Sequence, residues 1–267
     1  MIYIYPKLPA VYTTPFMRVG GNGLANCLFV YAKAIVLAQK YKATMISPAW
    51  FNFSIGTYLR NESDKRHYLG IINHNNEVCG LRKLFILLFT ARTNDEKQLH
   101  DNRDEVLIVE GIYDFFKPLL PYQQYIHNYL IGHINHNLLK EIDSFDFSDS
   151  IAVHVRLGDF PTERRVPLEW YVEQIRLQRN SKNILLFSDG TDEELEMLLS
   201  IPNVKRVYFG GAIQDIVAIS KCSYLIGSDS SFSAWGAFLG QVPCIFYRLQ
   251  FGSVLNNSKL QIIEHKY

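Results

Sequence analysis

The second half of the chain alternates between short apolar segments and longer amphipathic ones. The apolar segments have the length and composition of buried strands, and the segments between them carry apolar residues at helical spacing. The expected strands cover residues 151–155, 184–187, 206–209, 224–226 and 244–247. The expected helices cover residues 168–179, 191–200, 215–222 and 232–239. Such alternation predicts an α/β domain in which a parallel sheet has helices on both faces.

The first half has a less regular pattern. Apolar residues recur at intervals of four and three from Leu24 to Ala38, which predicts an amphipathic helix over residues 24–40. Strands are expected at residues 1–5, 43–47 and 106–110, and a helical segment at 119–140. Residues 56–104 are polar and mixed, and they match no single pattern.

A Ser- and Asp-rich stretch at residues 143–150 predicts a domain boundary. The chain has 267 residues, of which 48% are hydrophobic, so each half can bury a core of its own. We therefore expect an N-terminal domain, 1–146, and a C-terminal domain, 147–267.

The longest apolar run, Leu84–Phe89, is far shorter than the ~20 residues that a helix needs to span a bilayer. A buried segment is the favoured interpretation, and a shallow contact with a membrane surface is the alternative. Residues 1–5 are expected to form a strand ended by Pro6 and do not resemble a signal peptide.

The balance of charge and the cysteines narrow the class of protein. With 27 basic and 26 acidic side chains the net charge is +1, so no strong field attracts nucleic acid, although a local basic pocket for phosphate is compatible with it. The cysteines, which lie singly in apolar stretches, are Cys27, Cys79, Cys222 and Cys244. Reduced, buried thiols of a cytoplasmic protein are the favoured interpretation, and disulfides are the alternative.

Polar residues and glycines follow four of the expected strands in the second half. They are His154 to Asp159, Ser188 to Gly190, Gly210 with Gly211, and Gly227 to Ser231. Because parallel strands bind ligands beyond their carboxyl ends, these residues are expected to meet at one edge of the sheet.

Each of these residues has a chemical use there. Arg156 can direct two donors at a phosphate, and Ser230 and Ser231 precede a helix whose N-terminus can hold a diphosphate. Asp189 can accept paired N–H donors such as those of guanine. Gly158 permits a tight turn that directs Asp159.

Structural explanations stand beside these functional ones. Arg156 and Asp159 could form a local ion pair, Ser230 could be a helix N-cap, and Asp189 could cap the helix that begins at Thr191. We favour a ligand site because all of them fall at one sheet edge.

Two further clusters are weaker signals. Gly20, Gly21 and Gly23 precede a helix without the Lys-Ser/Thr of a P-loop, so they indicate either phosphate binding or close backbone approach across an interdomain cleft. The histidines of the 119–140 segment are His127, His133 and His136. They have no Cys or carboxylate partner nearby in sequence and the chain has no D-x-D triplet, so no metal is expected.

Four motifs occur in order along the chain. They are G-G-N-G-L-A-N-C-L-F-V-Y-A at 20–32, V-H-V-R-L-G-D-F at 153–160, L-F-S-D at 186–189 and D-S-S-F-S-A-W-G-A-F-L at 229–239. They resemble the motifs of the glycosyltransferase family 11 α-1,2-fucosyltransferases. The resemblance implies a GT-B-like α/β architecture, in which two Rossmann-type domains face each other across a cleft.

The resemblance also implies a reaction. The C-terminal half would bind GDP-fucose, the N-terminal half would bind the acceptor, and transfer would invert the anomeric centre without a metal or other cofactor. Arg156 would stabilise the departing β-phosphate as a catalytic residue. The implied substrate-binding residues are His154, Ser188, Asp189, Ser230, Ser231 and Phe232 in the C-terminal half, and Gly21, Asn22 and Asn26 in the N-terminal half.

This sequence departs from the family pattern in several places. Leu157 stands where the family has a second arginine, and Asn22, Ala25 and Ala234 also replace family residues. The base that accepts the proton of the acceptor hydroxyl is unsettled. Asp159 is the leading candidate, with Glu163 and Glu110 as poorer ones.

We therefore expect an inverting fucosyltransferase that acts on an oligosaccharide acceptor, with the 2-hydroxyl of galactose in a surface glycan or glycolipid precursor as the specific expectation. Lipopolysaccharide biosynthesis in the cytoplasm, with peripheral contact at the inner membrane, is the setting that this implies. A non-catalytic protein that binds a nucleotide sugar or glycan on the same fold is the alternative. A nucleotide-dependent oxidoreductase is disfavoured because no G-x-G-x-x-G follows the first strand of the second half.

Overall fold

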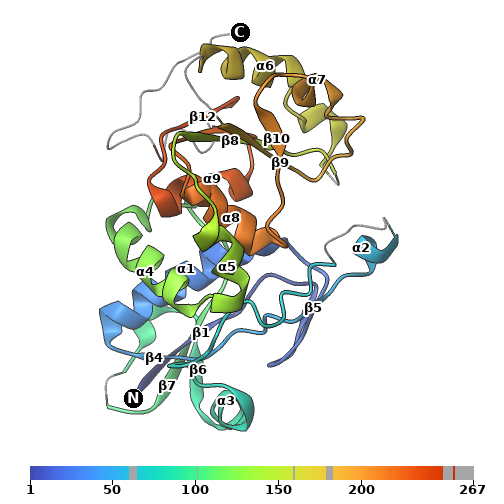
Figure 1. Ribbon diagram of the computed structural model, residues 1–267. Coiled ribbons are helices and arrows are strands. Elements are labelled where there is room, and N and C mark those ends of the chain that lie inside the picture. Colours follow the sequence, from blue (N-terminus) through green and yellow to red (C-terminus); the bar gives the residue numbers. More distant parts are fainter. Residues whose placement is uncertain (60–64, 101, 159, 179–182, 249–254, 256–267) are drawn as a thin grey trace. The chain divides into compact units, whose positions relative to one another are not determined.

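The chain forms two compact units, Met1–Leu138 and Leu139–Tyr267, in a computed structural model that describes residues 1–59, 65–100, 102–158, 160–178, 183–248 and 255 (Figure 1). The division lies ahead of the boundary expected at 146/147. The segment between the two positions has its contacts in the second unit: Asp143 pairs with Lys221 at 2.8 Å, and the ring of Phe145 packs on Phe209 at 5.3 Å.

The first unit contains a parallel sheet of four strands in the order β4-β1-β7-β6. Its strands are β1 (Ile2–Pro6), β4 (Thr44–Met45), β6 (Ala91–Thr93) and β7 (Glu105–Val109). A small second sheet joins β2 (Tyr12–Thr13), β3 (Arg18–Val19) and β5 (Asn52–Phe53). The strands expected at 1–5, 43–47 and 106–110 are thereby confirmed.

Helix α1 (Leu24–Tyr41) packs on this sheet. The first unit also contains α2 (Ile55–Leu59), α3 (Gly80–Phe89) and α4 (Gln123–His133), with the 3-10 turns η1 (Glu96–Gln98) and η2 (Leu120–Tyr122), and α5 (His136–Ser144) crosses the division between the units. The helix expected over 24–40 is confirmed as α1. The single helical segment expected at 119–140 is wrong, because the backbone becomes extended at Ile134. The side chain of Asn135 then accepts the N–H of Asn137 at 3.1 Å and begins a new helix.

Helix α3 packs on the sheet by one side only. Its residues Ile86 and Leu87 join Tyr3, Tyr5 and Val106 in a buried cluster. The outer side of the helix is exposed, including Phe85, Leu88 and Phe89. The expectation that Leu84–Phe89 is a buried segment is therefore wrong for half of the run.

The second unit is a five-stranded parallel sheet in the order β10-β9-β8-β11-β12. Its strands are β8 (Ser150–Val155), β9 (Asn183–Ser188), β10 (Val204–Arg206), β11 (Tyr224–Gly227) and β12 (Cys244–Phe246). Its helices are α6 (Leu168–Leu177), α7 (Glu196–Leu199), α8 (Ala212–Ser220) and α9 (Ser231–Gly240), with a 3-10 turn, η3 (Thr162–Arg164). Helices α6 and α7 cover one face and α8 and α9 the other (Figure 1). The predicted α/β class with Rossmann-type parallel sheets is confirmed.

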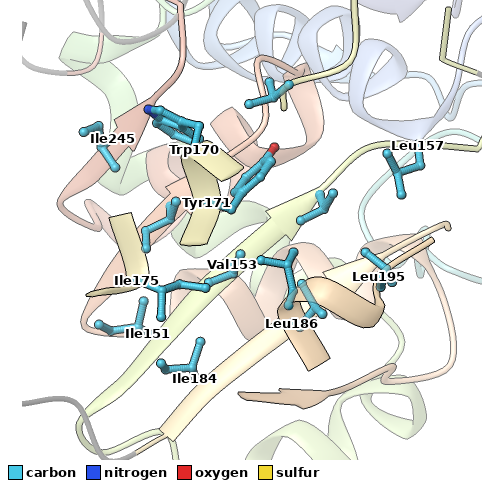
Figure 2. Close-up of a cluster of buried hydrophobic side chains, with 14 residues drawn as sticks. Ile151, Val153, Leu157, Trp170, Tyr171, Ile175, Ile184, Leu186, Leu195 and Ile245 are labelled. Carbon is cyan, nitrogen blue, oxygen red and sulfur yellow. The ribbon is translucent and has the colours of Figure 1, made fainter. Parts of the chain in front are cut away.

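The core of this unit is built by strand alternation. Ile151, Val153 and Val155 point to the face covered by α6 and α7, where they meet Tyr171 and Ile175 (Figure 2). Residues between them, including His154, point to the opposite face, toward α9. This alternation decides which side chains of β8 can reach a ligand.

Two predicted elements differ in extent. The helix expected at 191–200 is regular only over Glu196–Leu199, although its capping box forms: Glu194 accepts the N–H of Thr191 at 2.9 Å, and Thr191 accepts that of Glu194 at 3.2 Å. The strand expected at 206–209 ends at Arg206, whose side chain turns back to donate to Gly190 O at 2.6 Å.

Three cysteines are free and buried, as predicted, but Cys79 is free and exposed, contrary to prediction. Among the described residues, no helix combines the length and apolarity needed to cross a membrane. Within the same part of the chain, no His, Cys, Asp or Glu residues gather in threes that could hold a metal ion.

Candidate donor and acceptor sites

The order of strands in the second unit places a crevice between β8 and β11. The chain runs outward from β8 to β9 and β10, and then crosses to β11 and β12 on the other side. Connections that leave two neighbouring strands in opposite directions open a crevice at their carboxyl ends, where α/β sheets bind ligands. His154 and Arg156 lie at the end of β8, and Ser228 to Ser231 lie at the end of β11.

A cluster of three serines and a histidine fills this crevice. His154 Nδ1 lies 2.6 Å from Ser233 Oγ and 2.9 Å from Ser228 Oγ. Ser228 Oγ lies 3.1 Å from Ser230 Oγ, which in turn accepts the N–H of Ser233 at 3.3 Å as the N-cap of α9. The N-cap role considered for Ser230 is therefore confirmed, and the same hydroxyl belongs to the cluster. This network holds the start of α9 against the end of β8.

His154 is a neutral member of the cluster. Its side chain is buried, and its ring stacks on that of Phe232 with centroids 4.7 Å apart. Burial, assisted by the charge of Arg156, lowers the pKa of His154 to about 3. A neutral imidazole exchanges hydrogen bonds with hydroxyl groups without adding a charge to the site.

Arg156 is held by Asp189, at the end of the neighbouring strand β9. The guanidinium forms an ion pair with Asp189 Oδ2, and Asp189 Oδ1 accepts the N–H of Leu157 at 2.8 Å. Gly158 makes this arrangement possible, because a Cβ at that position would stand 2.5 Å from Asp189 Oδ2. The two side chains are 26% and 30% exposed, so the positive group is accessible at the sheet edge.

The other sequence candidates of this unit lie nearby or outside the described residues. Ser188, the last residue of β9, accepts the N–H of Gly190 at 3.0 Å, and Ser231 is the first residue of α9. Asp189 is engaged with Arg156 and Leu157, whereas the cap of the following turn is Thr191. Asp159, the leading candidate for the base, lies outside the described residues, and so does the ion pair considered between it and Arg156.

Sequence reasoning placed Ser228 at the sheet edge without giving it a role, and it missed Ser233. The repeated serines at 228, 230, 231 and 233 were the available signal, since a hydroxyl three residues after an N-cap faces the cap. Their pairing with His154 spans more than seventy residues and had no signature in the sequence.

Two polar atoms beside the cluster also went unpredicted. Tyr171 Oη and Asp229 Oδ1 are buried and lack a hydrogen-bond partner among the described residues. Burial raises the pKa of both groups. The nearby Asp229 carboxylate adds to the shift of Tyr171 and the Ser228 hydroxyl opposes it, while Arg248 opposes the shift of Asp229. Such atoms cost stability unless a water molecule or ligand satisfies them.

The first unit has a crevice of the same origin. Its sheet order puts β1 next to β7, and the chain leaves β1 toward β4 on the other side. A pocket of about 500 Å³ lies at the carboxyl ends of β1 and β7. It is lined by Lys7, Leu8, Pro9, Ala10, Thr13, Asn22, Glu110, Gly111, Ile112 and Tyr113.

The remaining sequence candidates are in this unit. Asn22 lines the pocket, and Gly21 precedes it, while Asn26 lies in the first turn of α1. Gly21 has a φ of +99°, and a Cβ there would stand 2.5 Å from Pro9 O and Ala10 Cα. The close backbone approach considered for the glycine cluster is thus real, but it is to a loop of the same unit.

A buried arginine fastens the loop that lines this pocket. Arg18 is fully buried and donates to Pro9 O at 2.9 Å, to Ala49 O at 2.7 Å and to Trp50 O at 3.3 Å. Hydrogen bonds from a charged donor are strong in such surroundings. Arg18 therefore ties the loop at Pro9 to the loop that contains Ala49 and Trp50.

The polar groups of the pocket are paired but exposed. Lys7 Nζ donates to Glu110 Oε2 at 2.8 Å, and Asn94 donates to Glu110 Oε1 at 3.3 Å. The ring of Tyr113 is 72% exposed beside them. Charged groups next to an exposed aromatic ring suit a polyhydroxylated ligand, which presents hydroxyls on its rim and C–H groups on its faces.

Comparison with known proteins adds a family and a fold. Residues 111–246, about half of the chain, match the model of glycosyl transferase family 11. No curated protein sequence matches the chain significantly.

Two solved fucosyltransferases share the fold. The fucosyltransferase NodZ from Bradyrhizobium is 14% identical, with a TM-score of 0.54 over 93% of this chain and 96% of that one. POFUT1 in complex with GDP is 12% identical, with a TM-score of 0.53 over 92% of this chain and 97% of that one. The predicted GT-B-like fold is thereby confirmed.

Proposed function

This chain belongs to glycosyl transferase family 11, and from that premise we propose that it transfers L-fucose from GDP-fucose to a glycan hydroxyl with inversion. One observation carries the proposal. At the switch point of the second sheet, the cation of Arg156 stands at the same edge as the serine cluster and the N-terminus of the ten-residue helix α9. A cation, hydroxyl groups and free backbone N–H groups are the donors that a diphosphate requires.

The reaction breaks the bond between the fucose anomeric carbon and the β-phosphate oxygen. The acceptor oxygen attacks from the opposite face, and GDP leaves with the electron pair of the broken bond. Negative charge therefore grows on the β-phosphate, where Arg156 and the N–H groups of Ser231 and Phe232 are proposed to stabilise it. The proposal assigns no metal to this step, since fixed protein donors supply the positive charge.

The other donor-site residues are proposed to shape the pocket. His154 supports the serine cluster, and Ser188 supports the turn at the end of β9. The ring of Phe232 stacks on one face of His154. Asp189 is proposed first as the residue that positions Arg156, since both of its oxygens are engaged. To recognise guanine, as the sequence analysis expects, Asp189 would have to give up the hydrogen bond from the Leu157 N–H and accept hydrogen bonds from the base instead.

The pocket of the first unit is proposed to bind the acceptor. The exposed ring of Tyr113 offers a face to a sugar, while Asn22, Lys7 and Glu110 offer hydrogen bonds to its hydroxyls. Gly21 and Asn26 support the wall behind Asn22. Glu110 is a carboxylate in the lining of this pocket, so it competes with Asp159 and Glu163 for the role of base.

The specific acceptor proposed is galactose, with transfer to its 2-hydroxyl, in a surface glycan or glycolipid precursor of the lipopolysaccharide type. We propose that the enzyme acts in the cytoplasm, in reach of the inner membrane. The competing candidate is a protein that binds a GDP-sugar or glycan without catalysis. The two differ in a single property, which is turnover.

Incubation of the purified full chain with GDP-fucose and a panel of galactosides tests the proposal, with GDP release and the linkage of the product as readouts. We expect a fucosylated galactoside, unchanged turnover in EDTA, and a loss of ~100-fold or more in Arg156→Ala. Arg176→Ala, which removes an exposed arginine of α6, is the matched control.

Several outcomes count against the proposal. Binding of GDP-fucose with neither hydrolysis nor transfer supports the non-catalytic candidate. Near-normal turnover in Arg156→Ala removes that residue from the leaving-group site. An equal loss of GDP and UDP affinity in Asp189→Ala shows that Asp189 does not read the base.

A further inference from the structure

Helix α3 presents an apolar face to the solvent. Leu81, Phe85, Leu88 and Phe89 are 83%, 64%, 60% and 72% exposed, and we refer to these four residues as the α3 face. They recur at intervals of four, three and one, so they lie along one side of the ten-residue helix. Phe85 and Phe89 pack on each other with ring centroids 4.7 Å apart.

The exposure of this face is not a sign of a loosely packed helix. Lys83, Ile86 and Leu87 on the opposite side are buried, and the last two belong to the core of the sheet. The helix is thus fixed in orientation, with one apolar side inward and another outward. A contiguous apolar patch held outward on a folded unit is typical of an interaction site.

The exposed charged residues of α3 and of β6, the strand that follows it, are basic. Arg82 lies in the same helix and Arg92 in the edge strand that follows it, and both are exposed. The sequence has no acidic residue from Val78 to Asn94. Glu105, the first residue of the neighbouring strand β7, is ion-paired with Arg103. Asp104, which precedes it, is ion-paired with the N-terminal ammonium.

These observations favour an anionic membrane surface over a second copy of the chain. In a twofold dimer the same patch meets itself, so Arg82 and Arg92 would face their own equivalents with no acid on the patch to pair with. Four exposed side chains also fall well short of the 20–30 residues that a standard interface contributes per partner. Phospholipids supply both an apolar layer and phosphate groups.

We propose that the α3 face docks on a bilayer that contains anionic phospholipid. The helix lies parallel to the membrane plane, with Phe85, Leu88 and Phe89 at the boundary of head groups and acyl chains. Arg82 and Arg92 contact lipid phosphates. This contact is independent of the donor chemistry, and it would hold the enzyme where a lipid-linked acceptor lies.

Flotation of the purified full chain with unilamellar vesicles tests the proposal. We expect the chain to float with vesicles of phosphatidylcholine that contain about 30% phosphatidylglycerol, and to bind less as salt screens the arginines. Phe85→Ser with Phe89→Ser should weaken binding by at least ~10-fold, because the variant has lost two aromatic rings that would be buried in the membrane. Arg82→Gln with Arg92→Gln should weaken binding to the anionic vesicles only.

The controls separate docking from folding and from catalysis. Leu177→Ser removes a leucine of α6 that is 57% exposed, and it should bind vesicles as the parent does. Thermal unfolding and transfer to a soluble galactoside should be unchanged in all of these variants, because the altered side chains are exposed and lie outside the proposed active site.

Three results would overturn the proposal. They are no flotation of the parent chain, equal flotation of the Phe85→Ser, Phe89→Ser variant, and a concentration-dependent dimer that this variant abolishes. The last result would assign the α3 face to a second copy of the chain. Vesicle binding without transfer would instead contradict the proposed function and leave the docking surface intact.

Discussion

Substitution of Gly158 by alanine tests the coupling between Arg156 and Asp189. The added Cβ would stand 2.5 Å from Asp189 Oδ2 and 2.9 Å from Asp189 Cγ, so the carboxylate has to move. Movement breaks the 2.8 Å hydrogen bond from the Leu157 N–H and the ion pair with Arg156.

The magnitude follows from these contacts. A hydrogen bond to a charged acceptor contributes ~1.5–3 kcal/mol, and a partly exposed ion pair adds ~0–1 kcal/mol. The alanine restores ~0.4–1 kcal/mol by restricting the unfolded chain. We therefore expect Gly158→Ala to lower the free energy of unfolding by about 2 kcal/mol, which for a unit of this size lowers the Tm by roughly 6–10 °C.

Thermal and urea unfolding of four proteins measure this effect: the parent, Gly158→Ala, Asp189→Ala and the double variant. Once the carboxylate is gone, the added methyl meets nothing closer than Asp189 Cβ at 3.5 Å. In the Asp189→Ala background, Gly158→Ala should therefore leave the free energy of unfolding nearly unchanged. Gly132→Ala, where a Cβ meets nothing within 4 Å, is the control and should be neutral or stabilising. An equal loss with and without Asp189 would refute the reasoning.

Two further predictions concern the groups buried beside this pair. Burial lowers the pKa of His154 to about 3, so its contribution to stability is complete above pH 6.5 and is lost as the pH falls toward 3. Between pH 7 and pH 5, the free energy of unfolding should fall by about 2 kcal/mol more in the parent than in His154→Gln, as measured by urea titration. An equal fall in the two proteins would contradict a buried neutral imidazole. Tyr171→Phe removes a buried hydroxyl that lies near Ser228 but makes no well-formed hydrogen bond among the described residues, so the free energy of unfolding should fall by less than ~1 kcal/mol or rise. A loss of more than ~1 kcal/mol would show that the hydroxyl is bonded.

The meeting of the candidate residues at one sheet edge could be predicted because it depends on strand ends. Parallel strands place their carboxyl ends together, so His154, Arg156, Asp189 and Ser230 meet at one edge whatever the details of packing. The same logic did not extend to the ion pair of Arg156. The ion pair of Arg156 with Asp189 on the neighbouring strand was not predicted. The pair considered between Arg156 and Asp159 lies outside the described residues.

The first unit shows what local patterns cannot predict. The run Leu84–Phe89 is apolar enough for a core, and hydrophobicity alone does not tell an inward face from an outward one. The break at Ile134 depends on a cap by Asn135 that competes with helix propensity on both sides. The burial of Arg18 depends on carbonyl groups of two separate loops, at Pro9 and at Ala49 with Trp50, which no pattern in the sequence brings together.

We propose above all that the second unit binds a diphosphate through Arg156 and the serine-lined N-terminus of α9. Calorimetric titration of the full chain with GDP and with GMP tests it most directly. We expect the parent to bind GDP at least ~10-fold more tightly than GMP, and Arg156→Ala to lose that preference while its affinity for GMP stays unchanged. Equal affinities of the parent for GDP and GMP would contradict the account.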